Sequence, residues 1–208
     1  MSKKKNQSPV TSQTIGEGRV IRNTGSSYIV RLDNGEELQC RIKGNFRIKG
    51  IRTTNPVAVG DIVTVAKASD DADYITAISP RTNYIIRRAS NLSKESHILA
   101  SNLDLAILVA TLREPVTTTT FIDRFLATAE AYSVSAALVL NKEDMWDDDD
   151  RELADALKNL YTSIGYPVFF VSAATGIGLK PLKEFISNKI TLLVGNSGVG
   201  KSSLINAL

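Results

Sequence analysis

Cysteine and histidine are almost missing from the sequence, which has one of each, Cys40 and His97, among 208 residues. A disulfide needs two cysteines, and a structural zinc site needs about four ligands that are mostly cysteine or histidine. This stretch can therefore form no internal disulfide and no Cys/His zinc site, and any structural metal has to be held by residues outside it. His97 lies in a polar segment, and we give it no catalytic role.

Long apolar runs are missing too. None approaches the ~18 residues that cross a bilayer, and the first ten residues, MSKKKNQSPV, lack the apolar stretch of a secretory signal. With 43% hydrophobic and 23% charged residues, the composition is that of ordinary folded domains. We expect a cytoplasmic protein with no membrane partner.

Charge is distributed unevenly between the two halves of the chain. Residues 1–100 carry 16 Lys and Arg against 9 Asp and Glu, whereas residues 101–208 carry 9 against 13. A basic first half favours a nucleic-acid partner, although a solvated basic face is the alternative. We expect the two halves to face different partners.

The first half predicts a small β-barrel. Between Gly18 and Pro80, segments rich in Val, Ile and Tyr alternate with Gly, Asn and Asp turns, and Asp33-Asn34-Gly35 is a strong hairpin signal. About five antiparallel strands in this length suit an OB-fold, the common small barrel that binds oligonucleotides. A barrel that only packs against its neighbour is the alternative. We assign residues 1–13 to a polar tail, 14–80 to the OB-fold and 81–102 to a polar linker.

Cations and aromatic rings recur along these strands and loops, which is the mixture that RNA-binding grooves use. We therefore predict RNA contact by the barrel, although the spacing does not single out individual residues. The candidates are Arg19, Arg22, Tyr28, Arg31, Arg41, Lys43, Phe46, Arg47, Lys49 and Arg52.

From Leu103 the pattern changes to alternating strands and helices, which predicts a parallel α/β sheet. The apolar strands are LDLAILVAT, SAALVL, PVFFVS and ITLLV. Thr117–Thr120 can cap the first helix, and Asp147–Asp150 precede the second, where the helix dipole favours carboxylates, so we interpret them as a cap and not as a metal site. The expected buried faces are Ile122, Phe125, Leu126 and Ala129 on the first helix, and Leu153, Ala156, Leu157 and Leu160 on the second.

The chain ends on a phosphate-binding loop. Residues 195–202, GNSGVGKS, fit the GxxxxGK(S/T) pattern between a predicted strand and a predicted helix. Glycines let backbone N–H groups wrap phosphates, the Lys201 ammonium is expected to reach the β and γ phosphates, and the Ser202 hydroxyl is expected to ligate Mg²⁺. Lys201 and Ser202 are thus the candidate catalytic residues, and Ser202 is the candidate metal ligand.

A base-recognition motif precedes this loop. Residues 141–144, NKED, fit NKxD at the carboxyl end of a predicted strand, where open α/β sheets place ligands. The Asp144 carboxylate can accept the N1–H and 2-amino hydrogens of guanine, which adenine lacks in that place. The following Ser172-Ala173-Ala174 can turn a backbone N–H toward the guanine O6. We predict GTP or GDP as the ligand; a P-loop ATPase or kinase with an accidental NKED is the alternative.

The order of these motifs is unusual. Ras-like GTPases have the phosphate loop first, then two switches, NKxD and SA, whereas here NKxD and SA precede the phosphate loop. Domain termini usually lie at the surface and close together, so a circular permutation is physically tolerated. We predict a circularly permuted P-loop GTPase domain over residues 103–208, with strand 190–194 beside strand 103–111.

Four stretches closely resemble the ribosome small subunit-dependent GTPase A family, the YjeQ/YloQ-type permuted GTPases: VAVGDIVTV, ASNLDLAILVAT, FIDRFLATAEAYSVSAALVLNKEDM and VSAATGIGLKPLKEFISNKITLLVGNSGVGKSSLINAL. The resemblance, over Gly18–Leu208, implies an N-terminal OB-fold, a permuted GTPase domain and a C-terminal zinc-binding helical domain. It implies a GTP hydrolase that binds the small ribosomal subunit and its rRNA during late maturation and leaves after hydrolysis. We expect a monomer and no DNA partner.

The family's second switch motif, DxxG, does not occur in the sequence, and neither do its first switch and zinc domain. Without the strand that follows the first switch, strand 190–194 would keep a bare apolar edge. We therefore expect these 208 residues to be part of a longer protein and to hydrolyse GTP poorly alone. A nucleotide-gated RNA-binding module with negligible turnover is the alternative. The candidate nucleotide-binding residues are Asn141, Lys142, Asp144, Ser172, Ala173, Gly195, Asn196, Ser197, Gly198, Val199, Gly200, Lys201, Ser202 and Ser203.

Overall fold

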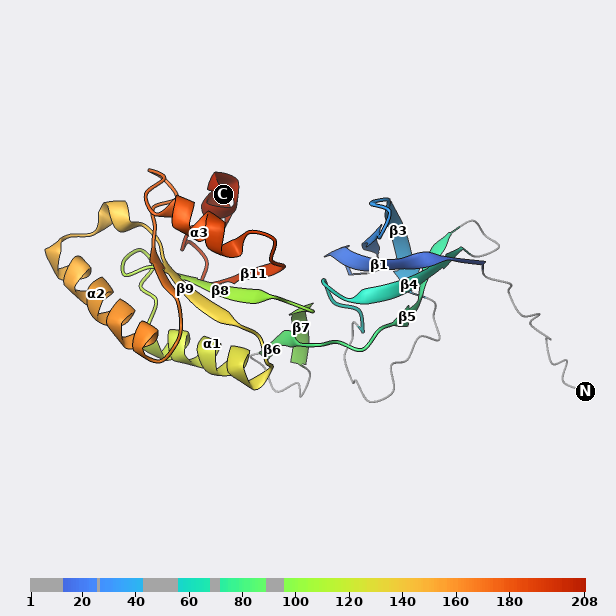
Figure 1. The fold of residues 1–208 in the computed structure, drawn as a ribbon, viewed down its shortest axis with the longest axis horizontal. Helices are drawn as coiled ribbons and strands as arrows, with labels where there is room; N and C mark the ends of the chain where they lie inside the picture. The colour runs from blue at the N-terminus through green and yellow to red at the C-terminus, as the bar shows by residue number, and fades with distance from the viewer. Residues whose placement is uncertain (1–12, 26, 43–55, 68–71, 89–95) are drawn as a thin grey trace, which may run out of the picture. The chain divides into compact units, whose positions relative to one another are not determined.

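A computed structural model describes residues 13–25, 27–42, 56–67, 72–88 and 96–208 (Figure 1). The chain forms two compact units, Met1–Thr82 with Ile86–Ser101, and Asn83–Ile85 with Asn102–Leu208. The predicted polar tail lies outside the described residues, apart from Gln13, where the first strand begins. Among the helices that the structure describes, none has the length and apolar character needed to cross a membrane.

The first unit contains a closed five-stranded barrel. Its strands pair in the order β1-β2-β3-β5-β4 and back to β1, which is the order of an OB-fold, so the predicted barrel is confirmed. The hairpin between β2 and β3 turns at the predicted site, where Gly35 has a φ of +86° and its N–H donates to the Leu32 carbonyl at 2.9 Å. The strands are β1 (Gln13–Asn23), β2 (Tyr28–Leu32), β3 (Glu37–Ile42), β4 (Ile62–Lys67) and β5 (Asp73–Ile78).

One pair of barrel strands is parallel, contrary to the expectation of antiparallel pairing throughout. Strands β3 and β5 run in the same direction, with Cys40 opposite Asp73, while the other four pairs of neighbours are antiparallel. The reason is geometric: alternating directions cannot close around an odd number of strands, so one pair has to be parallel.

The barrel interior is filled by alternate residues of all five strands. Val20, Val30, Val63 and Ile75 are fully buried in it. Tyr28 is buried with them at 1% exposure, so the prediction that its ring stacks on RNA is wrong: it occupies an inward position of β2 and fills the core. Lys43, Phe46, Arg47, Lys49 and Arg52, the remaining candidates of the 43–52 segment, lie outside the described residues.

Cys40 is expected to resist alkylation in the folded protein. Its side chain is fully buried, and burial, together with the nearby Asp73 carboxylate, raises the pKa of the thiol from 9.0 to about 12. The thiol form is thus favoured by folding, and this contribution to stability is present below about pH 9 and declines as the pH rises from there toward 12. Iodoacetamide labelling at pH 8, followed by mass spectrometry, should proceed only after urea is added; equal rates in native and unfolded protein would contradict this.

Part of the predicted polar linker is ordered as a two-stranded sheet. It consists of β6 (Tyr84–Arg88) and β7 (Ser96–Ser101). His97 is exposed on β7, which agrees with its having been given no role.

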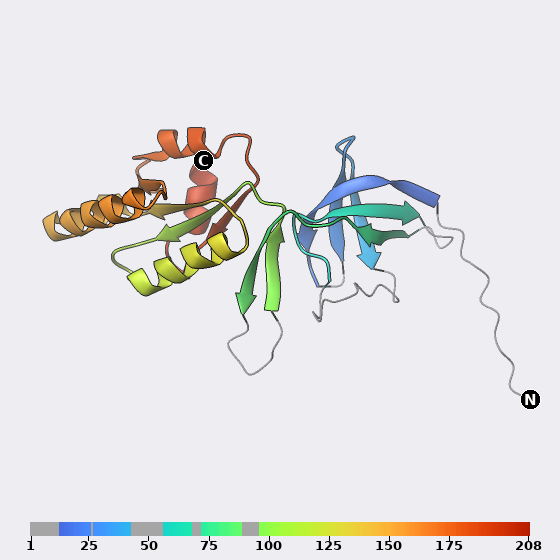
Figure 2. The same ribbon diagram turned by 60° about the horizontal axis from the view of Figure 1, so that its bottom comes forward.

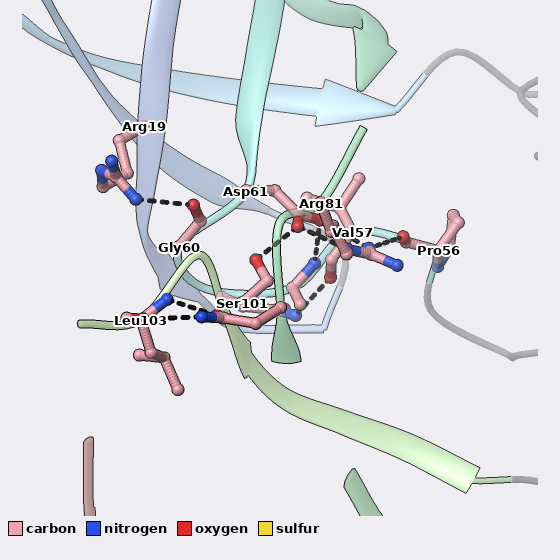
Figure 3. A network of polar contacts seen from close by, with 11 residues as sticks. Arg19, Pro56, Val57, Gly60, Asp61, Arg81, Ser101 and Leu103 are labelled. Carbon is pink, nitrogen blue, oxygen red and sulfur yellow. Dashed lines mark hydrogen bonds and ion pairs between the residues drawn. The ribbon is translucent and has the colours of Figure 1, made fainter. Parts of the chain in front are cut away.

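A buried polar network holds Arg81 and Ser101, which lie near the two ends of the predicted linker and belong to the first unit (Figure 3). The Asp61 carboxylate is fully buried and accepts hydrogen bonds from Arg81 at 2.6 and 2.7 Å, from the Ser101 hydroxyl at 2.5 Å and from the Ala58 N–H at 2.8 Å. Arg81 also donates to the Pro56 carbonyl at 2.9 Å. The chain before β4, the chain after β5 and the end of β7 are thereby joined at one carboxylate.

Arg81→Met is expected to lower the free energy of unfolding of this unit by about 3–5 kcal/mol, because it leaves a buried carboxylate without its countercharge. Arg31→Met is the matched control, since Arg31 pairs with Glu37 in solvent, with side chains 56% and 45% exposed, and such pairs are worth about 0–1 kcal/mol. Hydrogen exchange of barrel amides, followed by mass spectrometry, measures both. Equal losses in the two variants would show that the buried pair is not what holds these segments.

The second unit is a parallel α/β sheet, as predicted. The strands are β8 (Leu105–Ala110), β9 (Ala136–Leu140), β10 (Val168–Phe170) and β11 (Thr191–Val194), in the order β10-β9-β8-β11. The predicted pairing of the last strand is confirmed, with Thr191 opposite Leu105 and Val194 opposite Leu108. β8 and β9 lie in the middle and are buried along their whole length.

Helices cover both faces of this sheet (Figures 1 and 2). α1 and α3 lie on opposite sides in both views, and Leu182 of α3 and Leu204 of α4 pack in one cluster with Ile107 and Val139 of the central strands. The helices are α1 (Thr119–Ala131), α2 (Asp148–Ser163), α3 (Leu179–Ile186) and α4 (Lys201–Ala207), with a short 3-10 helix η1 (Glu143–Met145) between β9 and α2.

The first helix follows the sequence prediction. α1 is capped by Thr118, whose side chain accepts the Phe121 N–H, and it buries Ile122, Phe125, Leu126 and Ala129.

The buried face of α2 differs from the predicted one. Leu157 is buried as predicted, but Leu153 and Leu160 are 49% and 52% exposed and Ala156 is exposed as well; the other buried residues are Asp150, Ala154 and Tyr161. A polar contact lies near each end of the helix, and the one at Tyr161 joins it to α1. A capping box joins Asp147 and Asp150, which confirms these carboxylates as a cap, and the Tyr161 hydroxyl donates to Asp123 of α1 at 2.9 Å.

Candidate nucleotide-binding site

The glycine-rich loop connects β11 to α4 and is shaped by close backbone approach. A Cβ on Gly195 would lie 2.3 Å from the Val109 carbonyl of β8, and a Cβ on Gly200 would lie 2.3 Å from the side-chain nitrogen of Asn141. Gly195, Gly198 and Gly200 all have positive φ, at +152°, +84° and +90°. Gly195 and Gly200 therefore require glycine both for conformation and for space, and Gly198 requires it for conformation.

Lys201 lies across this loop. Its ammonium donates to the carbonyls of Gly195 at 2.9 Å and Asn196 at 2.6 Å. The positive charge is thus held against the first two residues of the loop. Of the other loop residues, Val199 is buried in the core of the unit and anchors the loop, whereas Ser197 and Gly198 are exposed.

Asn141 joins the three predicted motifs. It follows β9, is 2% exposed, donates from its amide nitrogen to the Val199 carbonyl at 2.9 Å and accepts the Ala173 N–H at its amide oxygen at 3.1 Å. The base-recognition motif, the SA segment and the phosphate-binding loop therefore meet at one side chain, although they are separated by up to 58 residues. The amide group can do this because its nitrogen donates to one loop while its oxygen accepts from the other.

The rest of the base-recognition motif lies at the same edge of the sheet. Lys142 has a left-handed backbone, with a φ of +68°, and its ammonium donates to the Glu114 carbonyl. Asp144 is in η1, and its carboxylate is exposed, with no hydrogen bond or ion pair to another described residue.

The SA segment forms a closed turn. The buried Ser172 hydroxyl accepts the Thr175 N–H at 3.1 Å, and the Ser172 carbonyl accepts the Gly176 N–H at 2.9 Å. Because the Ala173 N–H donates to Asn141, that group is not free for the guanine O6 in this arrangement. Within the tripeptide, the Ala174 N–H makes no hydrogen bond to any residue that the structure describes, so it is the candidate donor that the sequence did not single out.

The sequence also did not identify the loop of residues 111–117, which follows β8 and contacts two of these motifs. Its Glu114 carbonyl accepts Lys142, and a Cβ on Gly198 would lie 3.4 Å from Pro115. A signal was available: the loop leaves the carboxyl end of a fully buried central strand, the edge where α/β sheets bind ligands.

The donor set fits a nucleotide with Mg²⁺. Three glycines with positive φ leave positions 195, 198 and 200 of the loop without side chains, and Gly200, the N-cap of α4, offers no side chain to the first N–H groups of that helix, so these donors suit phosphate oxygens. Ser202 and Ser203 are exposed in the first turn of α4, and a hydroxyl is a hard oxygen ligand of the kind Mg²⁺ takes beside phosphates. In the described part of the chain no three Asp, Glu, His or Cys side chains cluster as a metal cage.

A parallel sheet ending in a phosphate loop, with the base-recognition motif earlier in the chain and a β-barrel in front, defines a circularly permuted P-loop nucleotide-binding protein. The RsgA GTPase family model matches residues 78–208, and the RsgA N-terminal domain model matches residues 17–75. The chain belongs to the RsgA GTPase family, which confirms the resemblance found in its motifs.

Curated relatives support the same family. The chain is 62% identical over 194 residues to the small ribosomal subunit biogenesis GTPase RsgA of Porphyromonas gingivalis and 46% identical over 195 residues to that of Flavobacterium johnsoniae. Both matches include 92% of this chain, but they include only 62% and 60% of the length of the two relatives, so the chain spans less than two thirds of each.

Among solved structures, the chain is similar to YjeQ from Thermotoga maritima, with a TM-score of 0.72, 33% identity, and 92% of this chain and 64% of that one covered. It is also similar to YloQ, described as a circularly permuted GTPase, with a TM-score of 0.67, 32% identity, and coverage of 92% and 63%. The predicted fold class, an OB-type barrel followed by a permuted P-loop domain, is thereby confirmed.

Gly200→Ala is expected to destabilise the second unit by about 2 kcal/mol more than Gly176→Ala. Both glycines have a left-handed φ, +90° and +85°, so both variants carry the same backbone cost. Only at Gly200 does the new Cβ displace Asn141, which leaves buried hydrogen-bonding groups unpaired. Urea unfolding followed by the fluorescence of Trp146, the single tryptophan, measures the difference, and equal losses would argue against Asn141 as the junction.

Proposed function

We propose that the protein containing this chain binds and hydrolyses GTP, and that it acts on the small ribosomal subunit during its biogenesis. The observation that carries the proposal is the position of the Asn141 amide. Asn141 belongs to the base-recognition motif, and its side chain bonds directly to the phosphate loop at Val199 and to the SA segment at Ala173. One nucleotide can therefore engage both the base-recognition motif and the phosphate loop. The names of the relatives, which describe small ribosomal subunit biogenesis GTPases, supply the biological setting.

The phosphate side of the proposed site is formed by residues 195–203. Lys201 supplies positive charge for the β and γ phosphates, and the loop N–H groups hold their oxygens in place while water attacks the γ phosphorus. Ser202 is the proposed Mg²⁺ ligand; when bound, the ion neutralises charge on the phosphates. The contribution of the chain is thus positioning and electrostatic stabilisation.

The base side of the proposed site is formed by Asp144, Lys142 and the SA turn. The exposed Asp144 carboxylate can accept two hydrogens from guanine. Adenine would leave this carboxylate desolvated and unpaired, so the site is proposed to select guanine.

The barrel is proposed to bind rRNA through its exposed cations. Arg22 and Arg41 are exposed on β1 and β3. Arg31 is exposed too, but its charge is shared with Glu37, and Arg19 donates to the Gly60 carbonyl at 3.0 Å. Arg22 and Arg41 are therefore the described candidates for phosphate contact.

Asp144→Asn is expected to reduce base selectivity. In the full-length protein with small ribosomal subunits, unlabelled GDP should suppress GTP hydrolysis at far lower concentration than ADP, and the substitution should reduce this preference by about 100-fold or more, since charged acceptors are lost to both guanine donors. Asp155→Asn, at an exposed position of α2, is the matched control and should leave the preference unchanged.

Lys201→Ala in the same assay should abolish hydrolysis. Equal competition by GDP and ADP in the unaltered protein would refute the guanine assignment and favour a P-loop ATPase. Subunit binding that is identical with GDP, GTP or no nucleotide, and that persists without measurable hydrolysis, would favour an RNA-binding module without turnover.

A further inference from the structure

The loop of residues 111–117, between β8 and α1, belongs to none of the phosphate- or base-recognition motifs, yet it contacts both. Its first residue, Thr111, and its last, Thr117, are buried at 1% and 7% exposure. Three hydrogen bonds close it: Thr111 N–H to the Thr117 hydroxyl at 3.1 Å, Thr117 N–H to the Thr111 carbonyl at 2.9 Å, and the Thr111 hydroxyl to the Pro115 carbonyl at 2.5 Å. The loop is therefore a closed element with a fixed neck.

The tip of the loop meets the base-recognition motif at a strained point. Glu114 and Lys142 both have left-handed backbones, with φ of +44° and +68°, which cost energy for residues other than glycine. The Lys142 ammonium donates to the Glu114 carbonyl, so each of the two residues is bonded to the other. The position of Lys142 consequently depends on where the loop holds this carbonyl.

The loop also lies close to the phosphate side. Pro115 lies where a Cβ on Gly198 would come within 3.4 Å of its ring. A shift of the loop would therefore move groups next to both the base side and the phosphate side of the proposed nucleotide site.

Arg113 ties the loop to the start of α2. Its guanidinium pairs with Asp147, the N-cap residue of α2, and with Asp150 at 2.6 Å. Asp147 and Asp150 are themselves joined as the capping box and follow Asp144 by three and six positions. The segment that carries Asp144 is thereby bounded by Lys142 on one side and by the Asp147 cap on the other, and the 111–117 loop holds both.

We propose that Arg113 is a positioning residue for guanine recognition: by pairing with Asp147 and Asp150 it fixes the 111–117 loop against both ends of the Asp144 segment, and so orients the carboxylate that reads the base. The inference rests on the proposed function, because it needs guanine as the ligand. A role confined to stability is the competing account. The Arg113 and Asp147 side chains are 46% and 51% exposed, and such ion pairs contribute about 0–1 kcal/mol to folding, but the Asp150 side chain is only 10% exposed, so its pair with Arg113 also stabilises the fold. A role confined to stability changes thermal unfolding and leaves the preference for guanine unchanged, whereas the positioning role changes that preference.

The test compares GDP with inosine diphosphate, which lacks the 2-amino group of guanine. In the full-length protein, Arg113→Ala should raise the Kd for GDP about tenfold, equivalent to about 1.4 kcal/mol, and the Kd for inosine diphosphate by less, so the preference for GDP falls. Arg113→Lys, which keeps a cation near both carboxylates, should restore much of the preference. Arg124→Ala, at an exposed arginine of α1, is the matched control and should change neither Kd.

Isothermal titration calorimetry gives both dissociation constants, and thermal unfolding without ligand is recorded for each variant. A GDP affinity within twofold of the unaltered protein, or equal weakening of both nucleotides, overturns the proposal and leaves Arg113 a residue of the helix cap. Failure of the proposed function is seen separately, before any variant is made, as equal affinity of the unaltered protein for GDP and ADP, and it ends this inference as well.

Discussion

The arrangement of the loops in the second unit depends on the two hydrogen bonds of one buried amide, which donates at one end and accepts at the other. Asn141 donates to the carbonyl of Val199 and accepts the N–H of Ala173, so both polar ends of the side chain are satisfied away from water. Aspartate could accept but not donate, and leucine would leave two backbone groups unpaired in a buried place. The absence of a Cβ at Gly200 gives the amide its room. Three loops are thus fixed by one side chain and one missing side chain.

Because these loops are joined through a side chain, their order along the chain is free to change. What has to be kept is the order of the parallel strands in the sheet, β10-β9-β8-β11, which brings the carboxyl ends of all four to one edge, with β8 between β9 and β11. The sequence predicted this part well. A GK(S/T) loop, an NKxD motif and four apolar strands are local patterns, and the parallel connection rule then leaves few sheet arrangements.

Features that depend on contacts distant in sequence were harder to predict. Periodicity placed Leu153 and Leu160 of α2 inside, but α2 instead buries Tyr161, whose hydroxyl bonds to Asp123 of α1, 38 residues earlier, and periodicity does not encode such a contact. In the barrel, the alternating pattern of β2 predicts a strand with one buried and one exposed face, but it does not say on which of the two faces Tyr28 lies. The 111–117 loop was missed because its role lies in backbone carbonyl position, for which no residue type is diagnostic.

In both units, separate segments of the chain are held together by one buried polar side chain whose hydrogen-bonding groups are all paired. Asp61 joins the segments ending at Ala58, Arg81 and Ser101 as Asn141 joins the nucleotide loops, and among the described residues no buried side-chain nitrogen or oxygen lacks a partner. Hydrophobic packing alone tolerates small shifts of a loop, whereas a hydrogen-bonded group in a low-dielectric interior loses much of its stabilisation when its partner moves. Polar anchors therefore set loop positions more narrowly than the apolar core does, and the proposed nucleotide site requires this, because it would hold a phosphate chain and a base at a fixed separation.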